Sequence, residues 1–168
     1  PPTCPPAIGR GHIVVCDAAG ALSIYSAATG STLAAYSNAD HTDAIHLVCQ
    51  QEQGNGDLLI AKADASSIAL FDFKEKKITM RWQAARPQIT SLCFSPKHND
   101  LIVGQKNGSL YAYDIAGREI WEDHQGAGAI TGTTLIEDTE RQDADICVVA
   151  SATGGIRGIT IRQTLIRP

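Results

Sequence analysis

Apolar residues along this chain occur in short runs that alternate with polar residues and are separated by turn-forming residues. Four such segments align with one another, beginning at His12, Asp57, Asp100 and Asp145, so the pattern returns after 45, 43 and 45 residues. Alternation of this kind predicts strands that are buried on one face. Because no stretch shows the 3.6-residue period of a helix, we expect an all-β fold.

Shorter apolar runs precede three of these segments, at residues 44–49, 88–94 and 129–136. Each copy therefore contains about four strand-like pieces in 40 to 45 residues, which is typical of a β-propeller blade. One such sheet cannot cover both of its own faces, so we expect about four antiparallel, four-stranded blades that pack against one another.

The repeat boundaries follow from these alignments. The first copy shows no convincing innermost strand before His12. We place a proline-rich segment at residues 1–11 and the copies at about residues 12–43, 44–86, 87–128 and 129–168.

The third copy is the best preserved, with the hairpin NGSLYAYDIAGREIW at residues 107–121. Asn-Gly is the strongest two-residue hairpin signal, so Asn107-Gly108 predicts a turn. Strand alternation then predicts that two small apolar residues share one face and two tyrosines the other: Leu110 and Ala112, against Tyr111 and Tyr113.

With the preceding strands, ITSLCFSPKHNDLIVGQ from Ile89, this copy resembles a WD40 repeat. In that family a His follows the outer strand, an Asp occupies the tight turn between the second and third strands, and an aromatic-Asp pair ends the third strand. The matching residues here are His41, Asp64 and the pair Phe71-Asp72 in the second copy, and Tyr113-Asp114 in the third. The resemblance implies a structural role for them, with His41 hydrogen bonded to the Asp64 turn.

The chain departs from the WD40 pattern at several places. Arg86 lies near the position of the expected His, and Asn107 replaces the turn Asp. Tyr25-Ser26 and Ile159-Thr160 hold the pair position in the outer copies. The segment GSLYAYDIAGREIW also resembles a quinoprotein-type propeller repeat, which leaves that propeller type as an alternative. Trp82 and Trp121 are read as ending equivalent outer strands.

The number of copies is small for this family, whose rings usually have about seven blades. A half ring would expose a blade face and strand edges. We therefore expect the chain to be a portion of a larger ring, which further residues or another chain complete.

The net charge and the cysteine spacing narrow the classes of function that fit this chain. A net charge of −4 argues against a chain that binds nucleic acid over its whole surface. The five cysteines show no CxxC spacing, and four lie in apolar runs, which favours a reducing, intracellular location, cytoplasmic or nuclear. Neither a membrane span nor an export signal is expected.

The sequence motifs give little support for a catalytic site. His41 and His46 lie five residues apart, which suits neither a helical nor a strand metal site, and no metal or cofactor is expected. The glycine-rich stretch at 126–132 leads into a predicted strand instead of a helix, so it is read as a loop and not as a phosphate site. No GxSxG or HExxH motif occurs, and we expect no enzyme activity.

The favoured hypothesis is therefore a non-catalytic scaffold that binds proteins within a larger intracellular complex. A second hypothesis is an RNA-associated propeller in an assembly or processing machine, with three arginines near the end of the chain as a possible partner-binding set: Arg157, Arg162 and Arg167. A quinoprotein-like propeller is the third.

Overall fold

The computed structural model describes residues 4–9, 11–37, 47–52, 58–85, 88–95, 99–124, 128–138, 140 and 144–162, without the side chains of residues 47–52 and 162. Within these residues the chain forms fifteen strands and no helix. Accordingly, no helix in the described ranges is long and apolar enough to cross a membrane.

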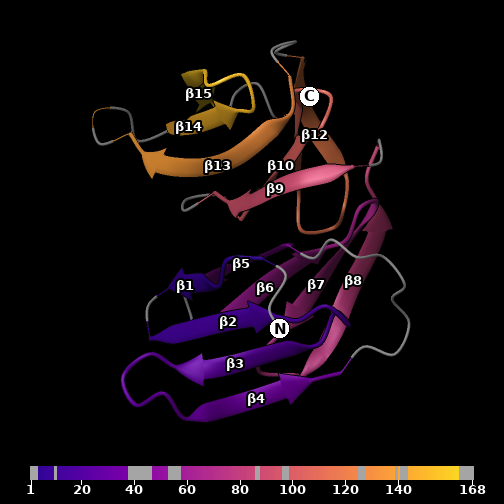
Figure 1. Cartoon of the computed structure of the whole chain (residues 1–168), viewed down its shortest axis with the longest axis vertical. Helices are drawn as coiled ribbons and strands as arrows, with labels where there is room; N and C mark the ends of the chain where they lie inside the picture. The colour runs from indigo at the N-terminus through magenta and orange to yellow at the C-terminus, as the bar shows by residue number, and fades with distance from the viewer. Residues whose placement is uncertain are drawn as a thin grey trace. The chain divides into compact units, whose positions relative to one another are not determined.

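The strands form antiparallel sheets in chain order (Figure 1). Three sheets have four strands and one has three among the described residues, which confirms the all-β, propeller-like fold. The strands are β1 (Ala7–Gly9), β2 (His12–Cys16), β3 (Leu22–Ser26), β4 (Thr32–Tyr36), β5 (Leu47–Glu52), β6 (Leu58–Ala63), β7 (Ser67–Asp72), β8 (Lys77–Gln83), β9 (Ile89–Phe94), β10 (Leu101–Gln105), β11 (Ser109–Tyr113), β12 (Glu119–His124), β13 (Ile130–Glu137), β14 (Ala144–Ser151) and β15 (Ile156–Arg162).

Strand β1 corrects one expectation. The sequence showed no convincing inner strand before His12, but Ala7–Gly9 pairs antiparallel with β2 and completes a four-stranded sheet. The strand is three residues long and follows Pro5 and Pro6, so it is too short to show alternation. Proline is tolerated in such a place because edge positions need no backbone donor on the outer side.

The chain divides into two compact units, Pro1–Ala84 and Ala85–Pro168. In the first unit, one face of the sheet β1–β4 packs against the sheet β5–β8. Val14, Ile24, Ile60 and Phe71 are among the fully buried residues of this core. The Phe71 ring lies 5.1 Å from the Tyr36 ring, measured between centroids.

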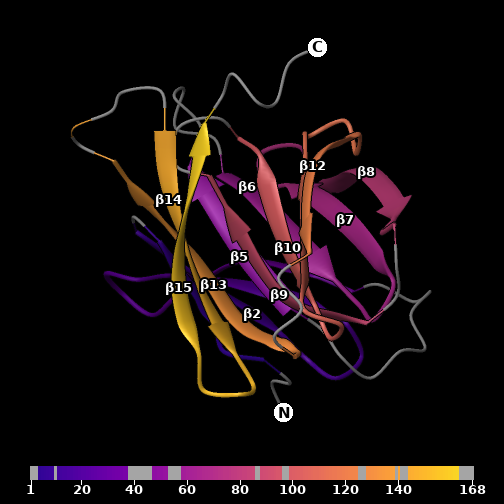
Figure 2. The ribbon, with the colours of Figure 1, turned by 90° about the horizontal axis from the view of Figure 1, so that it is seen from above.

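In the second unit the sheet β9–β12 packs against the sheet β13–β15, whose three strands lie side by side in Figure 2. The core includes Ile102, Leu110, Ala112 and Val149. Tyr111 and Tyr113 contact each other, with ring centroids 6.3 Å apart. The predicted division of β11 into a face of small apolar residues and a face of tyrosines is therefore confirmed.

Hairpin turns follow from local chemistry. Gly108 has a φ of 86°, which few other residues adopt, and the Asn107 side chain accepts a hydrogen bond from the Ser109 amide at 3.0 Å. The predicted Asn-Gly turn is thus confirmed. The loop has three residues, not two, because Lys106 also leaves the ladder and donates its amide to the Gln88 carbonyl at 3.0 Å.

Candidate interaction surfaces

The acidic residues of the repeat pattern lie at turns, where they accept hydrogen bonds from the backbone. Asp64 follows β6, and its carboxylate accepts hydrogen bonds from the amides of Ser66 and Ser67 and from the Ser67 hydroxyl. Asp72 ends β7 and accepts the Glu75 amide at 2.9 Å. His41 lies outside the described residues, so its predicted bond to the Asp64 turn stays a prediction.

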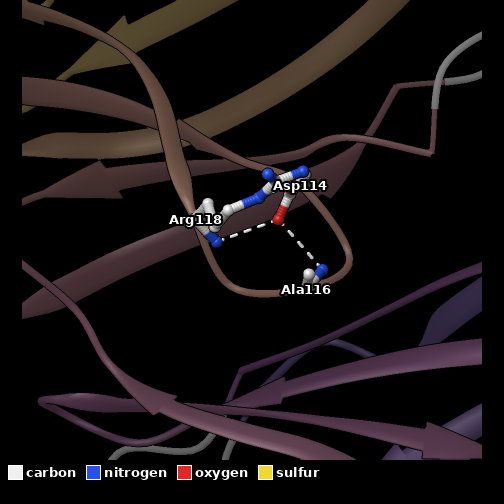
Figure 3. Close-up of polar contacts among 3 residues, drawn as sticks. All are labelled: Asp114, Ala116 and Arg118. Carbon is white, nitrogen blue, oxygen red and sulfur yellow. Dashed lines mark hydrogen bonds and ion pairs between the residues drawn. The ribbon is translucent and has the colours of Figure 1, made fainter.

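Asp114 shows the same arrangement most completely (Figure 3). One carboxylate oxygen accepts the amides of Ala116 and Arg118, both at 2.9 Å, and the other accepts Arg118 Nε at 2.7 Å. Burial acts to raise the pKa of Asp114, but the hydrogen bonds and the charge of Arg118 outweigh it, so this pKa lies below its ordinary value. The carboxylate is therefore ionised and held by its own turn.

The aromatic partners of these acids point into the protein. Phe71 is buried in the first core. The Tyr113 hydroxyl is buried and accepts a hydrogen bond from the Ala85 amide at 2.9 Å, and burial raises the pKa of Tyr113. The aromatic-acid pairs thus join a core residue to a turn residue, and a catalytic use would require these contacts to break.

Sequence reasoning missed a buried cation, Lys62 on β6. Its side chain is 4% exposed, and Nζ donates to the Gly20 carbonyl in the β2–β3 turn at 2.6 Å. Burial lowers the pKa of Lys62, while the neighbouring Cys16 opposes this shift. The signal was present, because Lys62 is the only charged residue inside the apolar run LLIAKA.

Cys16 lies in the same core and does not form a disulfide. Burial raises the pKa of its thiol to about 11, although the charge of Lys62 acts in the opposite direction. A thiol with this pKa is protonated at neutral pH and is therefore a weak nucleophile. Among the described residues, no group of three or more His, Cys, Asp or Glu side chains is placed to hold a metal ion.

The arginine set is only partly described. Arg157 lies on β15, half-buried, on the face that it shares with Ile159 and Ile161, which pack in the second core. The side chain of Arg162 and all of Arg167 lie outside the described residues. RNA binding by these arginines stays a prediction, as does the quinoprotein alternative.

Within each unit, one sheet has an apolar face against which no other described sheet of that unit packs. In the sheet β1–β4, the face opposite the core carries a row in which Ile8 pairs with Ile13 and Ile13 with Tyr25, and Ile8 is 72% exposed. In the sheet β13–β15, the corresponding face carries Ile136 and Ile156, which are 53% and 75% exposed. These β-branched side chains lie on sheets whose other faces are packed, which is the pattern of a strand buried on both sides.

Comparisons with known proteins support the fold. The sequence matches no protein-family model and no curated protein. Two similar solved structures are computationally designed proteins. Ika4 is 18% identical, with a TM-score of 0.67, and the match covers 93% of this chain and 89% of Ika4. Ika8 is 16% identical, with a TM-score of 0.66, and the match covers 93% of this chain and 45% of Ika8.

BBS1N gives a third match. The structure of BBS1N, crystallised in complex with ARL6DN, is 19% identical, with a TM-score of 0.71 over 96% of this chain. The match covers 51% of BBS1N, so this chain spans about half of BBS1N and of Ika8, and most of Ika4. At this identity the likeness shows the fold alone, which is that of a β-propeller.

Proposed function

We propose that this chain is a non-catalytic portion of a WD40-like propeller of about seven blades, which holds protein partners within an intracellular multisubunit complex, cytoplasmic or nuclear. The observation that carries the proposal is the pair of apolar faces on the sheets β1–β4 and β13–β15 against which no other described sheet of the same unit packs. In a ring, each of these faces packs against a further blade, as the opposite face already does.

Four further observations support a scaffold. In the aromatic-acid pairs, the acid accepts hydrogen bonds within its own turn and the aromatic residue is buried. The Cys16 thiol is also buried and is protonated at neutral pH. Two of the similar solved structures extend to about twice the matched length. One of them, BBS1N, is crystallised with a protein partner. Rigid blades with short turns suit the display of surfaces to several proteins at fixed geometry.

Native mass tests the proposal. Size-exclusion chromatography with light scattering, on protein isolated without denaturation, should find the chain within a larger particle. Substitution of Ile136 and Ile156 by Lys should release it, because lysine opposes burial of the face, while circular dichroism stays unchanged. Ile115→Lys, an exposed isoleucine in the β11–β12 turn, is the matched control and should leave the particle intact. A soluble, monodisperse 168-residue monomer would overturn the proposal.

A further inference from the structure

The turn between β7 and β8 carries the strongest local positive charge in the described part of the first unit. Lys74, Lys76 and Lys77 fall within four residues, Arg81 follows on β8, and all four are exposed. Two acids lie among them: Glu75, 3.5 Å from Lys77 Nζ, and Asp72, which pairs with Lys77 across the hairpin. This basic hairpin therefore has a local charge of about +2 on a chain whose net charge is −4.

The backbone of this hairpin is unusual at Lys76. Its φ is 53°, in the left-handed region that an L side chain disfavours. Six other hairpin turns among the described residues place a glycine in this region just before the next strand: Gly11, Gly20, Gly30, Gly108, Gly117 and Gly154. Glycine would relieve the strain at position 76. Gln88 and Asn99 are the other described residues that adopt a positive φ without being glycine, so the strained backbone is a second feature that marks this turn beside its charge.

The basic hairpin includes β8, which is the outer strand of its sheet. In the strand order β5-β6-β7-β8, β8 comes last, and no described strand pairs with its outer side. An edge of this kind can accept an added strand through main-chain hydrogen bonds. The basic residues of the edge strand, Lys77 and Arg81, together with the lysines of the adjoining turn, repel most such strands and favour an acidic one. The exposed Met80 supplies an apolar contact within the same strand.

We propose that the basic hairpin binds an extended acidic segment of a protein partner, which adds to the sheet β5–β8 alongside β8. The inference rests on the proposed scaffold function and names the chemistry of one partner. A protein segment fits better than an anionic membrane or RNA. Only a peptide can use the backbone groups of an edge strand, and the four basic residues are at the lower limit of the four to eight typical of lipid-binding clusters, and acids lie among them.

A labelled synthetic peptide of eight alternating Glu and Val residues is a suitable probe for fluorescence anisotropy with the full chain. We expect saturable binding at 50 mM NaCl that weakens about tenfold at 300 mM, because both charges are exposed. A peptide N-methylated at alternate residues should not bind, because it cannot donate main-chain hydrogen bonds to the edge.

Lys76→Gly separates function from folding. This variant should melt a few degrees higher, because the strain is relieved, yet bind the peptide more weakly by about threefold or more. The triple variant Lys74→Gln, Lys76→Gly, Lys77→Gln should lose binding. Lys106→Gln, which removes an exposed lysine from the β10–β11 turn, is the matched control and should bind normally.

Three results would overturn the inference: no binding at 50 mM NaCl, equal binding by the triple variant, or equal binding by the N-methylated peptide. Tighter binding to phosphatidylserine vesicles or to single-stranded RNA, lost in the triple variant, would also overturn it in favour of that ligand. Because none of these variants touches Ile136 or Ile156, failure here is distinguishable from failure of the larger-ring proposal.

Discussion

The sheets β5–β8 and β9–β12 come from consecutive copies of one repeat, yet they fill equivalent buried positions differently. Phe71 pairs with Ile60, and Tyr113 pairs with Leu101. Two residues further along each central strand, Lys62 pairs with Ala69 in the first sheet, whereas Val103 pairs with Tyr111 in the second. The first sheet thus has a long side chain beside a small one, where the second sheet has a medium-sized side chain beside a large one.

The two pairs bury different polar groups. Lys62 Nζ has the Gly20 carbonyl as acceptor, at 2.6 Å. The Tyr111 hydroxyl is buried and has no hydrogen-bond partner among the described residues. The two sheets therefore share their strand pairing, while only the first supplies a described partner for its buried polar group.

The largest expected effect is a transfer of the lysine to the second sheet. Val103→Lys would bury a charge on a longer side chain beside the larger Tyr111. We expect a loss of several kcal/mol in the free energy of unfolding, measured by urea denaturation. Val103→Met adds length without charge and should lose about 1 to 3 kcal/mol. Equal losses in the two variants would show that charge is not the cause.

A smaller effect is expected one residue further on, where Ala63 and Gly104 are equivalent. A Cβ at Gly104 would overlap Ser91 Oγ and would lie 2.7 Å from Ile130 Cγ2, so Gly104→Ala forces these residues to move. We expect it to lose about 1 to 3 kcal/mol of stability. Ala63→Gly should lose about 1 kcal/mol, from backbone entropy. Wild-type stability in Gly104→Ala, by thermal and urea unfolding, would contradict the close contact.

The two tyrosines of β11 should respond oppositely to loss of the hydroxyl. Tyr113→Phe removes the acceptor of the Ala85 amide and should lose about 1 kcal/mol. Tyr111→Phe removes a buried hydroxyl without a described partner and should be neutral or stabilising by up to about 1 kcal/mol. Chemical denaturation of the two single variants in parallel tests the contrast, and the reverse order would refute it.

The smallest effect concerns alkaline pH. Burial raises the pKa of Cys16 to about 11, so the folded state favours the thiol, and its contribution to stability falls as pH rises from 9 towards 11. Burial lowers the pKa of Lys62, so the unfolded state binds more protons there, and the contribution of Lys62 to stability rises up to pH 10.5. The two contributions oppose each other.

Lys62→Met removes the rising contribution. The variant should therefore lose stability more steeply than wild type above pH 9, by about 1 kcal/mol per pH unit at most. Urea midpoints at pH 7, 9 and 10 measure the slopes. Cys16→Ala is the control and should flatten the loss; parallel slopes in wild type and Lys62→Met would contradict the buried charge.

Much of the fold could be predicted from the sequence, because strand alternation and turn chemistry act within a few residues. The repeat, the turn at Asn107-Gly108 and the two faces of β11 needed only local information. Strand β1 was missed because three residues after two prolines carry too little pattern. The strand register could not be predicted from the sequence either. Trp82 pairs with Ile68, but Trp121 pairs with Ala112. The two tryptophans that were predicted to be equivalent therefore lie two strand positions apart.

The candidate surfaces depended more on tertiary structure. The amino-acid sequence by itself determined that this chain is a repeating all-β protein, since the period of two and the turn residues are properties of neighbouring amino acids. Only the packing of the sheets decided that Lys62 is buried, that Gly104 has no room for a side chain, and that Ile136 and Ile156 stay exposed. Such features depend on contacts between residues distant in the sequence, which local pattern does not encode.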